Sequence, residues 1–165
     1  MLRPPFAQFP EIQLQGYVLR QLTDDDLPDI LPIIFYDGKP ALTPAKAKNI
    51  VARIENDYQS GNTINWGIAE KTTNKIVGTC GFYRGFANNT GEIGYVMHPG
   101  FRGSGIMQQA VAAISGFGTA QLGLEKVVAF TKPDNAASIA ILQKCGFTEE
   151  PSEEKAYLKF VFRKL

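Results

Sequence analysis

The sequence predicts a single α+β domain built on a mixed, mostly antiparallel sheet. The chain has 165 residues, of which 44% are hydrophobic and 20% charged, and this suits one domain with a real core. Segments that alternate between apolar and polar residues are interspersed with segments whose apolar residues recur at helical spacing. No repeat or low-complexity tract is visible. Residues 1–165 are therefore expected to form one domain.

Cap and turn residues divide the first half of the chain into elements. Residues 1–15 lack clear periodicity, and their role is left open. Thr23 and Asp26 resemble a capping box at the start of a helix that Pro32 should kink or end. Thr43 fits an N-cap for a second helix. The expected elements are a strand at 17–22, helices at 27–34 and 44–58, and strands at 65–70 and 75–84 that form a hairpin.

The stretch from Glu92 to Gln109 combines three features that together make an anion site. Its alternating residues predict a strand that stops at His98. Arg102–Gly105 then offers backbone N–H groups with little side-chain obstruction, and helical spacing begins at Ile106. The first N–H groups of a helix are unpaired and its dipole is positive there, so a pyrophosphate would fit. The glycines alone could instead merely permit a tight connection.

The last third of the chain supplies one more helix–strand–helix–strand succession. Asn135 is a plausible N-cap, and Gly146 ends the helix that follows it. The expected elements are a helix at 106–121, a strand at 126–131, a helix at 135–145 and a last strand at 156–163. The whole order is strand, two helices, three antiparallel strands, helix, strand, helix and closing strand.

Charge and cysteine content argue against several classes of partner. Lys and Arg number 17 and Asp and Glu 16, a net charge of +1, which gives no electrostatic case for nucleic acid or an acidic membrane surface. Cys80 and Cys145 are far apart and His98 is the one histidine, so no metal site is predicted. Buried, reduced thiols are favoured, which suggests a cytoplasmic protein. No apolar run approaches membrane-spanning length.

Two separate segments resemble the motifs of one enzyme family. Within Val96–Ile106, Arg102 is followed by two residues and Gly105, which resembles the acyl-coenzyme A binding motif of the GNAT superfamily of N-acetyltransferases. Residues 135–147 begin with Asn and end with Lys-x-Gly-Phe, which is similar to the second motif of that superfamily. The likeness covers most of the chain and looks closest to the RimJ/RimL-type branch. It implies helices on both faces of the sheet, splayed central strands and acetyl-CoA as co-substrate.

The resemblance also implies which residues hold the cofactor. Val96 and Met97 would contact the pantetheine arm, with the Met97 backbone near the thioester oxygen. The pyrophosphate would lie on the backbone amides of Arg102, Gly103, Ser104, Gly105, Ile106 and Met107. Asn135 is at least a helix cap and by resemblance also binds the pantetheine arm. The Arg102 side chain either pairs with phosphate or is a solvated charge.

Two residues, Ser138 and Glu92, are candidates for catalysis, and two departures from the family motifs precede the choice. Leu142 stands where many relatives have a tyrosine thought to protonate the departing thiolate, and Met107 stands where Gly or Ala is common. Ser138 is the best remaining candidate for stabilising or protonating the thiolate, the alternative being a hydroxyl bonded back to its own helix. Glu92 shares a face with Val96 if no bulge intervenes, and it could remove the amine's proton through a water. A solvent-facing or salt-bridged glutamate is the competing interpretation.

The expected function is transfer of an acetyl group from acetyl-CoA to a primary amine, either a protein N-terminus or a small amine. The alternative is a module that binds coenzyme A without turnover, which the leucine at position 142 motivates. A monomer or homodimer is expected. Tyr83, Tyr95 and Tyr157 could line a pocket, but aromatic strand residues usually serve the core.

Overall fold

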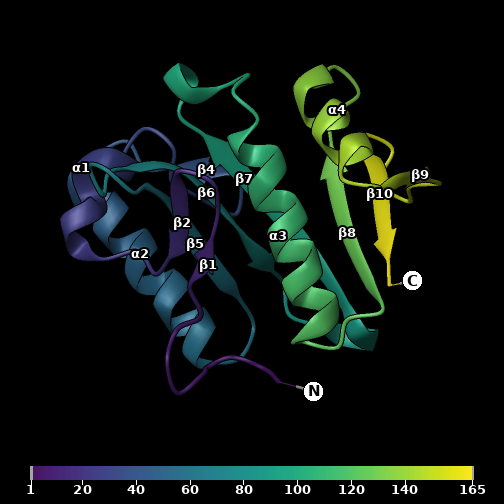
Figure 1. Cartoon of the computed structure of the whole chain (residues 1–165), viewed down its shortest axis with the longest axis horizontal. Helices are drawn as coiled ribbons and strands as arrows, with labels where there is room; N and C mark the ends of the chain where they lie inside the picture. The colour runs from purple at the N-terminus through teal and green to yellow at the C-terminus, as the bar shows by residue number, and fades with distance from the viewer. Residues whose placement is uncertain (1, 165) are drawn as a thin grey trace.

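The computed structural model describes residues 2–164 and contains one mixed eight-stranded sheet with helices on both faces (Figure 1). The strand order is β1-β2-β5-β6-β7-β8-β10-β9, and every neighbouring pair is antiparallel except β7 and β8. The strands of this sheet are β1 Ile12–Gln13, β2 Tyr17–Arg20, β5 Ile64–Glu70, β6 Ile76–Tyr83, β7 Thr90–Met97, β8 Lys126–Thr131, β9 Thr148–Glu150 and β10 Leu158–Arg163. The predicted fold class is therefore confirmed.

The helices are α1 Leu27–Ile30, α2 Pro44–Gln59, α3 Ile106–Ala120 and α4 Ala136–Lys144. Helices α3 and α4 lie side by side on one face of the sheet (Figure 1), over the main core, where Trp66, Phe82 and Phe160 are fully buried. Helices α1 and α2 contribute to a second, smaller core that includes Ile30 and Ile50. Burying each large apolar side chain contributes about 1.5–3 kcal/mol, so both helix layers are held mainly by apolar packing.

Strands β7 and β8 separate partway along their length. Their parallel pairing runs from Thr90 opposite Lys126 to Ile93 opposite Ala129 and no further. Beyond it, β7 stays paired to β6 as far as Met97, while β8 stays paired to β10 as far as Thr131. A gap therefore opens inside the sheet, beside the N-terminal ends of α3 and α4. This is the splay of the central strands that the resemblance implied.

Most predicted elements are found within one or two residues of their expected bounds, but the helix expected at 27–34 ends at Ile30 and the shortest strands were missed. Residues 1–15, whose role was left open, contain β1, and the last expected strand is preceded by β9. A two-stranded hairpin of β3 (Phe35–Tyr36) and β4 (Lys39–Pro40) also lies between the first two helices, where no strand was expected. Strands of two or three residues are too short to show a period of two. The N-terminal arm packs on the core, where the Trp66 indole donates to the Pro10 carbonyl at 2.7 Å.

Both cysteines are free thiols. Cys80 is buried as expected, whereas Cys145, also expected to be buried, is only partly so. Burial raises the pKa of the Cys80 thiol well above its usual range, which makes it a poor nucleophile. Within residues 2–164, no helix is long and apolar enough to cross a membrane, and no three metal-ligating side chains of the described residues come together.

Candidate active site

The loop before α3 leaves several backbone donors open. Gly103 and Gly105 have φ values of 75° and 79°, a left-handed conformation that suits glycine. Gly105 is the N-cap of α3, and no side chain caps the helix, so the N–H groups of its first turn have no intrahelical partner. The Ser104 hydroxyl donates to the Phe101 carbonyl and so fixes the loop. The anion site predicted from the sequence is thus present as a geometry: exposed N–H groups at the positive end of a 15-residue helix.

Two positions whose roles were open are Arg102 in this loop and Met107 in the first turn of α3. The Met107 side chain is 5% exposed and packs into the main core, so it does not cover the loop. Arg102 is exposed, and its Nε donates to the Met97 carbonyl at 3.4 Å. Its guanidinium therefore lies between the end of β7 and the anion loop, a position compatible with either of its two interpretations.

The edge of β7 that faces the gap carries unpaired backbone groups. The His98 N–H donates to the Val77 carbonyl of β6 at 2.9 Å. Because backbone groups alternate between the two edges of a strand, those of Tyr95 and Met97 point the other way, into the gap. Since β8 has already separated there, these N–H and C=O groups have no strand partner, and within residues 2–164 the Met97 carbonyl accepts only from the Arg102 side chain. They suit a ligand that itself contains amide groups, as a pantetheine arm does.

Helix α4 places a hydroxyl beside this gap. The Asn135 side chain accepts from the Ser138 N–H at 3.1 Å, so Asn135 is the cap that the sequence predicted. The Ser138 hydroxyl lies 2.7 Å from the Tyr95 hydroxyl, and its partner is therefore across the gap rather than in its own helix. Burial raises the pKa of Tyr95 to about 12, although the hydrogen bond to Ser138 opposes the shift. Both hydroxyls are consequently protonated at neutral pH, so one donates within the pair and the other keeps its proton for a ligand.

Leu142 lies in the main core with no exposed surface. It cannot donate a proton, and its side chain is sequestered from the gap. The aromatic hydroxyl near the start of α4 is instead that of Tyr95, a residue of β7. Tyr95 was expected either to line a pocket or to serve the core, and the position of its hydroxyl next to Ser138 was not foreseen.

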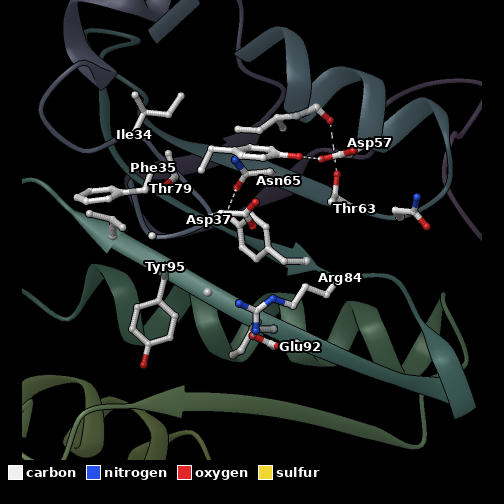
Figure 2. A pocket seen from close by; sticks show the side chains of 18 of the residues that line it. Ile34, Phe35, Asp37, Asp57, Thr63, Asn65, Thr79, Arg84, Glu92 and Tyr95 are labelled. Atoms are coloured by element: carbon white, nitrogen blue, oxygen red, sulfur yellow. Dashed lines mark hydrogen bonds and ion pairs between the residues drawn. The ribbon is translucent and has the colours of Figure 1, made fainter. Parts of the chain in front are cut away.

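A cavity of about 490 Å³ lies on the opposite face of the sheet, the face covered by α1 and α2 (Figure 2). It is lined by the β3–β4 hairpin, the C-terminal end of α2, and strands β5, β6 and β7. Gly94 in the cavity wall and Gly81 on the neighbouring strand leave room for side chains: a Cβ at Gly94 would lie 3.1 Å from the Tyr83 ring, and one at Gly81 would lie 2.8 Å from Asn65 Oδ1. The two glycines thus allow Tyr83 and Asn65 to lie flat against the strands.

Glu92 and Val96 both line this cavity. The pairing of β6 with β7 runs without a bulge from Met97 to Glu92, so these two side chains lie on one face, as the expectation required. The Glu92 carboxylate accepts from the Arg84 guanidinium at 2.8 Å, and the Glu92 side chain is 25% exposed. Glu92 is therefore both ion-paired and at the cavity. Its position agrees with a role in accepting the amine's proton, and its partner agrees with the salt-bridged interpretation. Tyr95 on the same strand points away from the cavity, toward the α3 and α4 face (Figure 2).

Several polar residues of the cavity had no recognisable signal in the sequence. Asn65 and Thr79 sit in buried strands, Asp57 is in the last turn of α2, and Asp37 is in the β3–β4 turn. Each of these four residues lies in an element whose position relative to the other elements is set by tertiary packing. The one available hint was a polar residue within an otherwise apolar strand, at positions 65 and 79.

Comparison with known proteins identifies the family of this fold and site. The family model described as an acetyltransferase (GNAT) domain matches residues 17–148. The chain belongs to this family. The GNAT assignment agrees with the motifs at 96–106 and 135–147, and it makes the protein an acyltransferase.

The relatives of this GNAT domain include one curated sequence that matches over nearly its full length. It is 28% identical over 150 residues, which cover 86% of this chain and 85% of the relative, to an uncharacterized N-acetyltransferase, YoaA, of Bacillus subtilis (strain 168).

Solved structures show the same fold. A putative ribosomal-protein-serine acetyltransferase from Vibrio cholerae has a TM-score of 0.82 at 19% identity, covering 99% of this chain and 100% of that one. RimL, a ribosomal L7/L12 alpha-N-protein acetyltransferase in complex with coenzyme A, has a TM-score of 0.80 at 19% identity, covering 93% and 98%.

Proposed function

We propose that this GNAT domain transfers the acetyl group of acetyl-CoA directly to a primary amine, which is bound in the cavity between the β3–β4 hairpin and the sheet. The observation that carries the proposal is the separation of β7 and β8. On one face of the sheet the gap meets the anion loop and the two hydroxyls, and on the other face β7 lines the cavity. A thioester placed in the gap would therefore be open to attack from the cavity side.

The cofactor fits the groups that line the gap. The amides of Gly103, Ser104, Gly105, Ile106 and Met107 would hold the pyrophosphate, whereas the Arg102 N–H, also expected there, already donates to the Pro99 carbonyl at 3.3 Å. The edge of β7 that has no strand partner at Tyr95 and Met97 would pair with the pantetheine amides. Asn135 lies at the start of α4, on the other side of the gap. Coenzyme A bound to RimL supports this class of ligand. When bound, acetyl-CoA supplies the activated acyl group.

The chain itself supplies the groups that manage charge and protons. The Met97 N–H is directed into the gap and would donate to the acyl oxygen as that oxygen gains negative charge. Ser138, with Tyr95 behind it, would donate to the departing sulfur. Glu92 on the cavity side would take the proton of the incoming amine through a water. The donors and the acceptor of protons thus lie on opposite faces of β7.

The direct test is release of free thiol from acetyl-CoA, measured against a panel of small amines and short peptides, with mass spectrometry of the products. We expect acetylated amine in amounts equal to the thiol released. Binding of acetyl-CoA is measured in parallel by calorimetry. Thiol release without an acetylated amine would indicate hydrolysis and would contradict the proposal.

A second candidate is a module that binds coenzyme A without turnover. It is favoured by one observation, the buried leucine at position 142 in place of a donor. Binding of acetyl-CoA without thiol release across the whole panel would establish this alternative. Thiol release that depends on the amine would exclude it.

A further inference from the structure

The cavity has an uneven charge distribution. Its lining includes three carboxylates, Asp37, Asp57 and Glu92, and one cationic side chain, Arg84. Arg84 is already bonded to Glu92 at 2.8 Å. Three negative charges and one positive charge give the lining a formal charge of −2, and the uncompensated charges are those of Asp37 and Asp57. A cavity with low-dielectric walls and an excess of one sign attracts ligands of the opposite sign.

Asp57 is held in place at the far end of the cavity. The Tyr36 hydroxyl donates to its carboxylate at 3.0 Å, and this bond raises the pKa of Tyr36. Asp57 lies in the last turn of α2, which contains no basic residue, so the negative end of the helix dipole adds to its potential. Arg53 stacks over the ring of Tyr36, 4.6 Å from its centroid, and does not line the cavity.

Asp37 approaches the same region from the β3–β4 turn. Its φ of 48° and the φ of 72° at Gly38 are the left-handed pair that closes a two-residue hairpin. Figure 2 shows Asp37 and Asp57 reaching the cavity from different elements. Among the residues that the structure describes, no Lys or Arg side chain forms an ion pair with either carboxylate.

Two buried polar side chains also reach the cavity without a complete set of partners. Asn65 is 6% exposed, and its Oδ1 accepts from the Tyr83 hydroxyl at 2.9 Å, while its Nδ2 has no partner in the described part of the chain. Thr79 is 5% exposed and lines the cavity, and within residues 2–164 its hydroxyl has no partner either. Neither polar atom is sealed in the core, since among the described residues the buried side-chain atom without a partner is Ser115 Oγ. Both therefore face the cavity and are available to a polar ligand atom between β7 and the two aspartates.

We infer that the acceptor is a small dication, whose second ammonium group binds Asp57 and Asp37 while its first amino group lies at Val96 beside the gap, and whose connecting segment carries an oxygen bonded by Asn65 and Thr79. This inference rests on the proposed function and names the substrate class of that site. The cavity of about 490 Å³ has the size of a small-molecule site. Polyamines with an ether or hydroxyl group, and sugars with two amino groups, have this chemistry.

The test compares matched acceptors by kcat/KM in the thiol-release assay. Butylamine has one charge and 1,4-diaminobutane has two on the same carbon chain. We expect the diamine to be preferred by more than about tenfold, and this preference to fall as salt is added, because the second contact is a charge pair. Asp57→Asn keeps an acceptor for Tyr36 but removes the charge. It should bring the ratio of the two acceptors close to one, whereas the exposed Asp25→Asn should leave the ratio unchanged.

A second pair of probes tests the polar segment. Bis(2-aminoethyl) ether and 1,5-diaminopentane have equal length and charge and differ by one oxygen. The ether should be the better acceptor, and Asn65→Leu should remove that advantage. Equal use of the two probes by the native protein would overturn this part of the inference.

The inference and the proposed function fail in different ways. If butylamine, or a peptide with one positive charge, is acetylated as well as the diamine, the dication inference is wrong and the amine acetyltransferase stands. If no amine gives thiol release although acetyl-CoA binds, the proposed function itself is wrong. A diamine preference that survives in Asp57→Asn would place the second charge elsewhere and overturn the assignment.

Discussion

The Tyr95 hydroxyl on β7 lies 2.7 Å from the Ser138 hydroxyl on α4, and this contact spans the place where β7 and β8 have separated. The two residues come from opposite sides of the gap that would receive the pantetheine arm. Because Leu142 is buried and apolar, this pair supplies the hydroxyl donors next to the expected position of the sulfur. A thiolate leaving group needs such a donor, since its charge develops in a partly desolvated site.

Replacing Ser138 by alanine should lower kcat much more than it raises the KM for acetyl-CoA. The hydroxyl would act mainly on charge that appears as the sulfur departs, so its loss should cost roughly 10²-fold in turnover. Steady-state thiol release at saturating amine measures both constants. A variant with native turnover would show that the serine is structural.

Tyr95→Phe should act through the same interaction as Ser138→Ala. If Tyr95 orients the Ser138 hydroxyl, the double variant should be little slower than the serine variant alone, because the two effects are coupled. Fully multiplicative losses in the double variant would mean that the two hydroxyls act independently.

Replacing Gly105 by valine should weaken acetyl-CoA binding. The φ of 79° at Gly105 is unfavourable for valine by about 1–2 kcal/mol, and its relaxation would turn the first N–H groups of α3 away from the phosphates. Calorimetry should show an affinity loss of at least about tenfold.

The matched control for Gly105 is Gly16→Val. Gly16 has a φ of 77° and, like Gly105, no atom within 4 Å of an added Cβ, but it lies in the turn between β1 and β2. Both variants should lose similar stability in thermal unfolding, and only Gly105→Val should lose affinity. Equal acetyl-CoA affinity in both folded variants would show that the pyrophosphate does not bind at this loop.

The anion loop and the cap of α4 could be predicted because each depends on neighbouring residues. Gly103 and Gly105 provide left-handed conformations, and Asn135 bonds to an N–H group three residues on. Such interactions are determined within one turn of chain. The splay of β7 and β8 followed from resemblance to a known fold, since no local pattern records where two strands part.

The cavity could not be predicted because its lining comes from elements that meet only after folding. Asp57 on α2 and Asp37 in a two-residue turn converge with Asn65 of β5 through packing of the α2 layer on the sheet. The side of β7 on which Tyr95 lies also depends on strand register. The sequence marked it as an ordinary strand aromatic, and its hydroxyl partner is 43 residues away.

Replacing Glu92 by glutamine should reduce turnover by roughly two to four orders of magnitude if Glu92 accepts the amine's proton. Acetyl-CoA affinity should barely change, because Glu92 faces the cavity and the cofactor loop lies beyond the other end of β7. Raising the pH should partly restore the rate, since more of the amine is then neutral.

Arg84→Gln distinguishes a base from an ion-pair partner. It also breaks the Arg84–Glu92 contact of 2.8 Å but keeps the carboxylate. Its turnover should stay within about tenfold of the native value if the carboxylate is the base. Equal, large losses in both variants would show that the pair as a whole positions the cavity wall, and near-native activity of Glu92→Gln would leave deprotonation to solvent.

The ion pair between Arg20 and Asp26 should make stability depend on pH. The two side chains are 2.8 Å apart and 14% and 6% exposed. Burial alone would raise the pKa of Asp26, but hydrogen bonds from Arg20 and from the Thr23 backbone lower it below its ordinary value. A carboxyl whose folded pKa is depressed adds stability that is complete above its unfolded pKa of about 3.9 and is lost as the pH falls through the folded pKa.

Asp26→Asn should therefore reduce the free energy of unfolding in urea by about 2 kcal/mol at pH 7, because it leaves the Arg20 guanidinium nearly buried without its counter-charge. Below about pH 4 the difference between the native protein and the variant should shrink, because Asp26 then becomes protonated in the native protein as well. The control is Asp24→Asn, whose carboxylate is 66% exposed and lies 3.6 Å from Lys48. That exposed pair should contribute less than about 1 kcal/mol at any pH. A loss in Asp26→Asn that stays constant from pH 7 to pH 3 would show that shape and hydrogen bonding, rather than charge, account for the contribution of Asp26.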